Sequence, residues 1–142
     1  MFNAEEILNQ QIEGSNDTEV IQVPNGEYPA VITKVDVRTP KESVILDITW
    51  EIDDRDGSVQ EHTGREKNTV RQSIFLDITE SGGLDMGKGK NAQLGRLRES
   101  VGCNEGTFTF NDLVGKVALV RTEQRLYEGR TFVDVKGVAP IE

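Results

Sequence analysis

The sequence predicts a mainly β fold of five strands, with a single helix between the third and the fourth strand. Apolar and polar residues alternate with a period of two over most of the chain after residue 26, which is typical of strands with one buried face. Only residues 91–102 carry helical spacing, and turn-forming residues separate the segments. With 142 residues, the chain is long enough for one domain with a real core.

The first two strands are predicted at residues 27–38 and 43–53. The first, EYPAVITKVDVR, is rich in β-branched residues and ends before Pro40, which cannot donate to a strand ladder. In the second, SVILDITWEID, the apolar residues share one parity and Asp47 lies on the other. Because Trp50 has the apolar parity, we expect it in the core.

Residues 70–78, VRQSIFLDI, are predicted to form the third strand, after a polar stretch at 57–68 that predicts a mobile loop. Val70 and Ile74 have the buried parity, whereas Arg71 and Phe75 have the other. An aromatic ring on the wet face calls for an explanation. Either Phe75 is buried beneath the 57–68 loop, or it binds a ligand.

The helix is predicted to begin with Asn91 as its N-cap and to end at Gly102, with one apolar stripe made by Leu94, Leu97 and Val101. FTFNDLVG predicts a short capped turn, and strands at 116–123 and 130–138 follow, joined by the hairpin RTEQRLYEG. This succession is that of the OB-fold, a small Greek-key barrel that binds oligonucleotides or oligosaccharides. We therefore predict an OB-like β-barrel domain over residues 25–142.

Residues 1–24 are predicted to be a disordered acidic N-terminal arm, since they combine acidic and amide residues with few apolar anchors. The first 30 residues contain six acidic residues and no basic one. The net charge of −9 is unevenly distributed, because residues 64–98 hold seven basic residues against four acidic ones. That local charge of +3 is a candidate contact for a polyanion.

Several kinds of chemistry are disfavoured by the sequence. Gly82, Gly87 and Lys88 fit the start of a phosphate-binding P-loop, but Gly89 stands where the magnesium-holding Ser or Thr is needed. A single Cys103 and a single His62 provide neither a disulfide nor the usual zinc ligands. We therefore expect no catalytic residues, no metal and no cofactor. We also expect no membrane span, because no apolar run is long enough.

Arginine or lysine interleaved with aromatic rings is the pattern that sequence-tolerant binding of single strands needs, because every base can stack and every nucleotide carries a phosphate. Phe75 and Arg71 share one strand face, and Lys88 and Lys90 lie in a glycine-rich loop ahead of the predicted helix. The predicted nucleic-acid-binding residues are Arg71, Phe75, Lys88, Lys90, Arg96, Arg121, Arg125, Tyr127, Arg130 and Phe132.

The segment LDITESGGLDMGKGKNAQLGRLRESVG, followed by FTFNDLVGKVALV and the last two strands, resembles small bacteriophage-encoded OB-fold proteins of the single-stranded-DNA-binding type. The resemblance covers about residues 26–138 and implies a role in phage replication or recombination, in the cytoplasm of the host cell. Such proteins commonly end in an acidic tail that recruits partners. This chain ends in KGVAPIE and carries its acidic segment at the N-terminus instead.

The function predicted from the sequence is therefore non-catalytic binding of single-stranded DNA by base stacking and phosphate contacts. Phage or host replication and recombination proteins are the expected partners of the acidic N-terminus. The alternative is a β-barrel protein-interaction or virion assembly component that does not bind nucleic acid. A third possibility, an inhibitor that mimics DNA with its acidic surface, fits the net charge but not the clustered basic residues.

Overall fold

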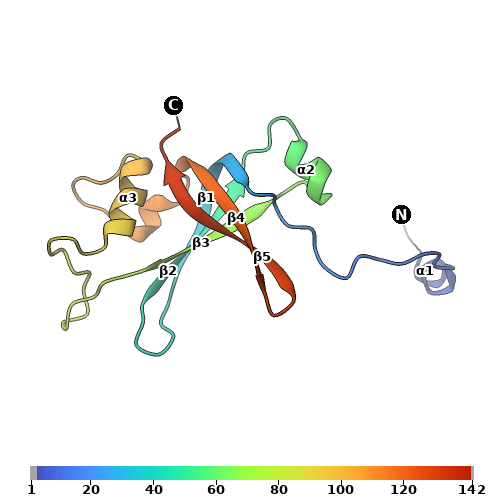
Figure 1. Cartoon of the computed structure of the whole chain (residues 1–142), viewed down its shortest axis with the longest axis horizontal. Helices are drawn as coiled ribbons and strands as arrows, with labels where there is room; N and C mark the ends of the chain where they lie inside the picture. Colours follow the sequence, from blue (N-terminus) through green and yellow to red (C-terminus); the bar gives the residue numbers. More distant parts are fainter. Residues whose placement is uncertain (1–2, 142) are drawn as a thin grey trace.

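The computed structural model describes residues 3–141, in which five strands form one sheet that closes on itself in the order β1-β2-β3-β5-β4 (Figure 1). The strands are β1 (Gly26–Arg38), β2 (Ile45–Ile52), β3 (Thr69–Phe75), β4 (Val117–Tyr127) and β5 (Arg130–Ala139). Neighbouring strands are antiparallel except β3 and β5, which meet in a parallel bridge at Arg71 and Asp134. The prediction of a mainly β fold with five strands is confirmed.

The ends of two strands differ from the prediction. Strand β3 ends at Phe75, which pairs with Ile45 at the start of β2. Strand β4 continues to Tyr127, which pairs with Arg130 across a two-residue turn. Both turn residues, Glu128 and Gly129, have positive φ angles of 49° and 78°. Such a turn matches the twist of a hairpin, so the stretch that was expected to be a connection is paired strand instead.

The core lies inside the closed sheet, as the alternation of residues predicts. Trp50 is fully buried, together with Leu46 and Ile48 of the same strand and Ile74 of β3. The indole N–H of Trp50 donates a hydrogen bond to Gln72 Oε1 at 3.0 Å. Burial of an indole N–H is costly without an acceptor, so Gln72 is the polar residue that allows Trp50 to lie at the centre.

The described residues contain three α-helices rather than the single one predicted, so that part of the prediction is wrong. Helix α3 (Ala92–Ser100) lies between β3 and β4. Helix α1 (Ala4–Asn9) precedes the sheet, and α2 (Ser58–Thr63) lies between β2 and β3. A short 3-10 helix, η1 (Phe110–Leu113), begins with a capping box between Thr109 and Asp112, where a capped turn was predicted.

Helix α2 stands where a mobile loop was predicted at 57–68. It packs on the core through Val59, which is buried. The carboxylate of Asp54 accepts hydrogen bonds from the backbone N–H groups of Val59 at 3.1 Å and Gln60 at 2.8 Å. A six-residue helix has too few turns to show periodicity, and the carboxylate that caps its first turn lies in the chain ahead of it.

Helix α3 buries Leu94 and Leu97 as predicted, and Gly102, with a φ of 77°, follows its end. Asn91 occupies the N-cap position but makes no side-chain cap, which corrects the prediction. Instead, its Oδ1 accepts a hydrogen bond from the backbone N–H of Asp77 at 2.7 Å, and its Nδ2 donates to the Asp77 carbonyl at 2.9 Å. These bonds hold together the two ends of the glycine-rich loop.

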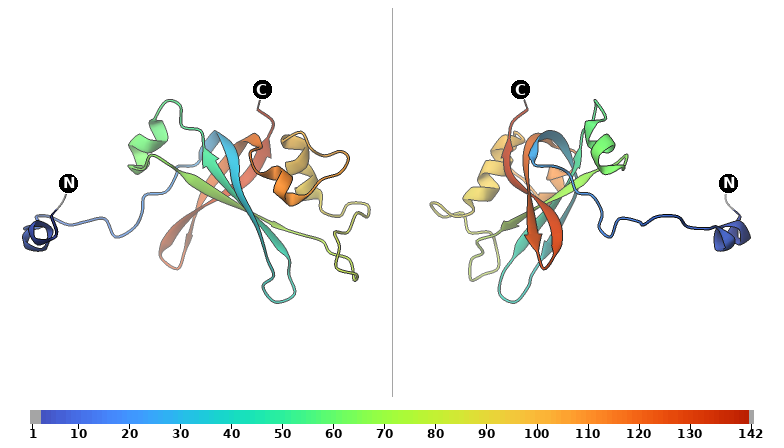
Figure 2. Two further views of the ribbon diagram at one scale, coloured as in Figure 1. Left: turned by 180° about the vertical axis from the view of Figure 1, so that it is seen from behind. Right: turned by 45° about the vertical axis from the view of Figure 1, so that its right-hand side comes forward.

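The N-terminal residues reach the sheet through an extended segment, and α1 lies at its far end, away from the sheet (Figures 1 and 2). Contacts with the sheet nevertheless begin before the boundary predicted at residue 24. Val23 is fully buried, and the Glu19 carboxylate accepts a hydrogen bond from the backbone N–H of Thr131 at 3.0 Å. Thr122 Oγ1 donates to the carbonyl of Pro24 at 2.9 Å.

Within residues 3–141, none of the helices has the length and apolar character needed to cross a membrane.

Candidate nucleic-acid interface

The outward side of β3 carries Arg71, Ser73 and Phe75, because the side chains between them point into the core. Phe75 is 65% exposed and is not covered by α2, so the structure excludes its burial beneath residues 57–68. An exposed aromatic ring on a strand face is costly to solvate and is available for stacking.

Strand β5 extends this surface on one side of β3. Asp134 is the bridge partner of Arg71, and Phe132 lies two residues earlier with the same orientation. Arg125 of β4 is the cross-strand partner of Phe132, and its guanidinium carbon lies 4.8 Å from the centre of the Phe132 ring. Arg125 Nε also forms an ion pair with Asp134 Oδ2. We call Arg71, Phe75, Arg125, Phe132 and Asp134 the aromatic face.

The two rings of the aromatic face lie on opposite sides of Arg71. Phe75 follows Arg71 by four residues along β3, and Phe132 precedes Asp134 by two residues along β5. Because the two strands run parallel and Arg71 stands opposite Asp134, the two rings lie on opposite sides of this pair. Six residues of strand correspond to roughly 20 Å. The face therefore offers two stacking positions with a cation between them.

Strand β2 supplies a buried carboxylate beside the aromatic face. Asp47 accepts hydrogen bonds from Ser73 Oγ at 2.7 Å and from Arg38 Nε at 2.6 Å. Burial alone would raise the pKa of the Asp47 carboxyl, but the hydrogen bonds from Ser73 and Arg38 and the charge of Arg71 outweigh it. The pKa therefore lies below its usual value, and Asp47 neutralises Arg38.

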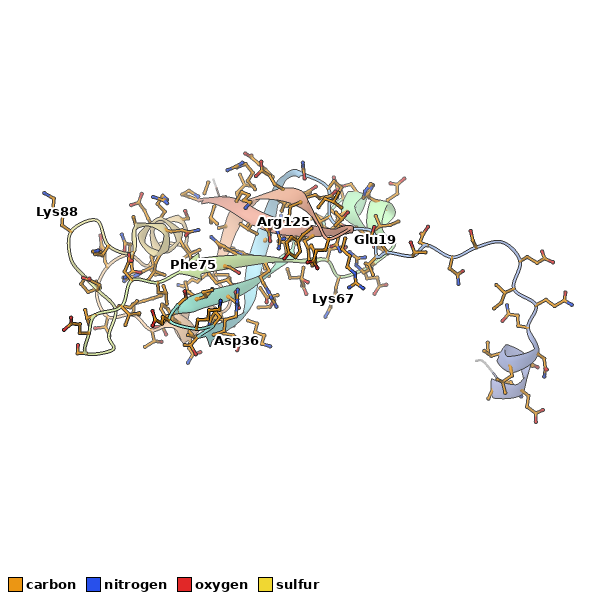
Figure 3. All side chains as sticks on the ribbon, turned by 60° about the horizontal axis from the view of Figure 1, so that its bottom comes forward. Glu19, Asp36, Lys67, Phe75, Lys88 and Arg125 are labelled. Carbon is orange, nitrogen blue, oxygen red and sulfur yellow. The ribbon has the colours of Figure 1, made fainter. Side chains whose placement is uncertain are left out.

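The structure does not bring all ten predicted residues together. Lys88 and Lys90 are exposed on the loop between β3 and α3, and Figure 3 shows Lys88 at the outer end of that loop, beyond Phe75 and away from Arg125. Arg96 is exposed on α3. The lysines and Arg96 thus belong to one end of the molecule and not to the aromatic face.

The remaining predicted residues lie on the ribbon of β4 and β5. Arg121 pairs with Glu123 at 3.6 Å and donates to the carbonyl of Lys136 at 3.3 Å. Tyr127 and Arg130 pair with each other at the hairpin turn and are exposed. Of the predicted cations on the ribbon, Arg121 and Arg125 are therefore already engaged by carboxylates.

Sequence reasoning missed the carboxylates that balance this surface. Asp47 and Asp134 carry the parity of the wet face, and that was the available signal. Each carboxylate pairs with an arginine that lies nine positions earlier on the neighbouring strand, Asp47 with Arg38 and Asp134 with Arg125. Such partners follow only from the register between strands.

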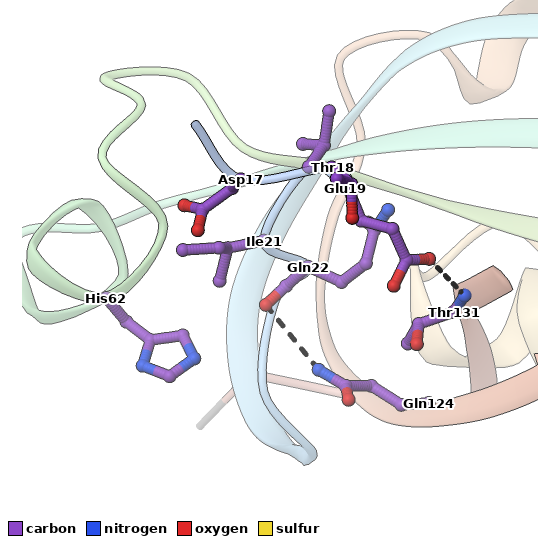
Figure 4. Close-up of a pocket in the computed structure, with 9 residues that line it drawn as sticks. Asp17, Thr18, Glu19, Ile21, Gln22, His62, Gln124 and Thr131 are labelled. Atoms are coloured by element: carbon purple, nitrogen blue, oxygen red, sulfur yellow. Dashed lines mark hydrogen bonds between the residues drawn. The ribbon is translucent and has the colours of Figure 1, made fainter. Parts of the chain in front are cut away.

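A separate pocket lies where the N-terminal segment crosses the sheet (Figure 4). Its lining comes from residues 17–22, His62, Gln124 and Thr131. The polar contacts there hold the segment to the sheet, with Gln124 Nε2 donating to the carbonyls of Val23 at 2.9 Å and Gln22 at 3.5 Å. In the described part of the chain, no three His, Cys, Asp or Glu side chains are grouped to hold a metal ion.

Comparison with protein-family models and with curated proteins finds no match to this chain.

Proposed function

We propose that this protein binds single-stranded DNA without catalysis, through the aromatic face. The observation that carries the proposal is the exposed ring of Phe75 on the same strand face as Arg71. A stacked base contributes about 1–3 kcal/mol, and a cation beside it binds the phosphate of the same strand. Phe132, which is 38% exposed, offers a second ring across the bridge between Arg71 and Asp134.

The fold supports the proposal. A closed five-stranded sheet with α3 between its third and fourth strands fits the OB-fold, which binds oligonucleotides on its second and third strands and adjacent loops. Phe75 and Arg71 belong to the third strand. The β1–β2 turn and the β4–β5 hairpin project from the same side of the closed sheet in Figure 1. A single strand crossing β3 would pass between them.

The proposed biological setting is phage replication or recombination in the host cytoplasm. What supports it is the resemblance of residues 76–102 and of the strands that follow. The exposed α1, with Glu5 and Glu6 in its first turn and Ile7 and Leu8 uncovered, is the proposed contact for phage or host replication proteins.

The test is a fluorescence anisotropy titration of a labelled single-stranded thirty-mer at 50 and 200 mM salt. We expect salt-sensitive binding, and Phe75→Ala should weaken it by roughly 5- to 160-fold, the equivalent of one lost stacking contact. Val114→Ala, which shortens an exposed apolar side chain after η1, is the control and should bind as the unmodified protein does. Absence of binding at both salt concentrations, or equal affinity of Phe75→Ala, contradicts the proposal.

Exposed apolar residues at the β4–β5 hairpin favour a second candidate function, a protein-interaction or virion assembly component. Leu126 is 75% exposed and Tyr127 is 59% exposed, so most of the surface of both residues is open to a partner. Size-exclusion chromatography beside the titration separates the two functions. A large assembly that ignores the oligonucleotide, and that Leu126→Ser dissociates, supports the second.

A further inference from the structure

Several cations on the strands of the aromatic face and its neighbours are neutralised by carboxylates within the sheet. Arg125 pairs with Asp134, Arg38 with Asp47 and Lys34 with Asp36. Among the described residues, Arg71 is the cation of the face that forms no such ion pair. The surface that would hold a polyanion therefore gives up part of its positive charge to internal ion pairs, and that loss needs a functional explanation.

Asp134 occupies the central position of this arrangement. Its carboxylate holds Arg125 Nε, and its backbone pairs with Arg71 of β3. The same guanidinium lies over the Phe132 ring, so Asp134 helps to hold Arg125 against the aromatic side chain. The Arg125 side chain is also 49% exposed, so a planar base can stack on its guanidinium.

We infer that Asp134 is a specificity-determining residue of the proposed DNA site, which keeps Arg125 from binding phosphate and reserves the Arg125–Phe132 stack for an unpaired base. The inference rests on the proposed function. A phosphate at the terminal N–H groups of Arg125 would lie beside the Asp134 carboxylate, whose negative charge repels it and already neutralises the guanidinium. Arg71, which forms no ion pair with any described residue, is left as the phosphate contact of the aromatic face itself.

The consequence is selection for single strands over duplexes. The bases of a duplex are stacked on each other and cannot reach a protein ring, so a duplex is held mainly through its phosphates. A face with neutralised cations and available rings has little hold on such a backbone. The carboxylate of Asp134 therefore costs phosphate affinity and disfavours the wrong substrate.

Asp134→Asn tests the inference, because it removes the charge and nearly preserves the side-chain shape. The freed Arg125 should take one further phosphate, so the salt slope for a single-stranded thirty-mer should steepen by about 0.7. The ratio of the variant's affinity for the thirty-mer to that of the unmodified protein should then fall by about 2.6-fold between 50 and 200 mM salt. Affinity for a blunt-ended duplex of equal length should rise as well.

Two further variants make the result specific. Glu61 is exposed on α2, and its side chain has no partner among the described residues. Glu61→Gln removes one negative charge there and should leave the salt slope for the single-stranded thirty-mer unchanged. In Asp134→Asn/Arg125→Gln the slope should return to that of the unmodified protein. Asp134→Thr, uncharged and suited to a strand, replaces Asp134→Asn if the latter does not fold.

Three results overturn the inference while single-strand binding persists. The first is a salt slope of Asp134→Asn equal to that of the unmodified protein. The second is a salt slope that Glu61→Gln steepens as much as Asp134→Asn does. The third is an affinity of Asp134→Asn for the duplex that does not rise. Loss of affinity at a constant slope would give Asp134 a purely structural role. If the unmodified protein binds no oligonucleotide, the proposed function itself fails, which is a different outcome.

Discussion

Trp50 and Gln72 are joined by a hydrogen bond of 3.0 Å inside the closed sheet, where both side chains are buried. Gln72→Leu would leave the indole N–H without its acceptor and should lower the free energy of unfolding by about 1–3 kcal/mol. Urea denaturation followed by the fluorescence of Trp50, the only tryptophan, measures it directly. In Trp50→Phe/Gln72→Leu, followed by circular dichroism, the cost should be less than the sum of the two single changes. Additive costs would contradict a shared bond.

Asp47 should make stability depend on pH in the acid range. Because the folded pKa lies below the unfolded value of about 3.9, its contribution is complete above that value and is lost as the pH falls through the folded pKa. Asp47→Asn should therefore cost roughly 1–2 kcal/mol at pH 7 and progressively less below pH 4. Urea denaturation at pH 7, 5, 4 and 3 gives the comparison. An equal difference at pH 3 and pH 7 would exclude this role of the carboxylate.

The folded unit should tolerate loss of α1 but not loss of Val23. A chain that begins at residue 17 keeps the Glu19 contact and the buried Val23, and its thermal midpoint should match that of the full chain. A chain that begins at residue 25 loses about 1.5–3 kcal/mol from Val23 and an acceptor for Tyr28 and Thr122 at the Pro24 carbonyl. Calorimetry of the full chain and of the two shortened chains measures their thermal midpoints. Equal midpoints in all three would place the start of the folded unit after residue 24.

The glycine-rich loop is predicted to add phosphate contacts at the edge of the proposed DNA site. Lys88 and Lys90 are exposed and form no ion pair in the described chain, so Lys88→Glu/Lys90→Glu should weaken oligonucleotide binding. The salt slope should flatten by about 1.4, which corresponds to two phosphates. Lys88→Gln/Lys90→Gln removes the two positive charges without adding negative ones. If the flattening is due to lost phosphate contacts, this variant should flatten the salt slope as much as Lys88→Glu/Lys90→Glu does. A double variant with the original affinity and slope removes the loop from the site.

The strands and the core were predictable because alternation is a local property. Trp50 has the parity of Leu46 and Ile48, and Phe75 has that of Arg71, so one was expected in the core and the other on the wet face. Both positions agree with the structure. Helix α3 was equally visible, since Leu94 and Leu97 are spaced for one helical stripe.

Helix α2 and the full length of β4 in the β4–β5 hairpin were not predictable from periodicity. Helix α2 depends on the carboxylate of Asp54 and on the burial of Val59, and neither is encoded in the spacing of its own six residues. The hairpin depends on positive φ angles at Glu128 and Gly129, of which only the glycine is an expected choice. A contact outside the element decides the extent of α2, and the backbone of the two turn residues decides the length of the hairpin strands.

The sequence by itself determined which side chains face the interior and which face the solvent, because that follows from the spacing of residues along each strand. Only the tertiary structure decided which exposed charges meet. Arg125 meets Asp134 and Phe132, and among the described residues Arg71 forms no ion pair, because the register between β3, β4 and β5 decides which exposed side chains stand opposite one another. Register is set by packing across the whole sheet, so no single segment contains it.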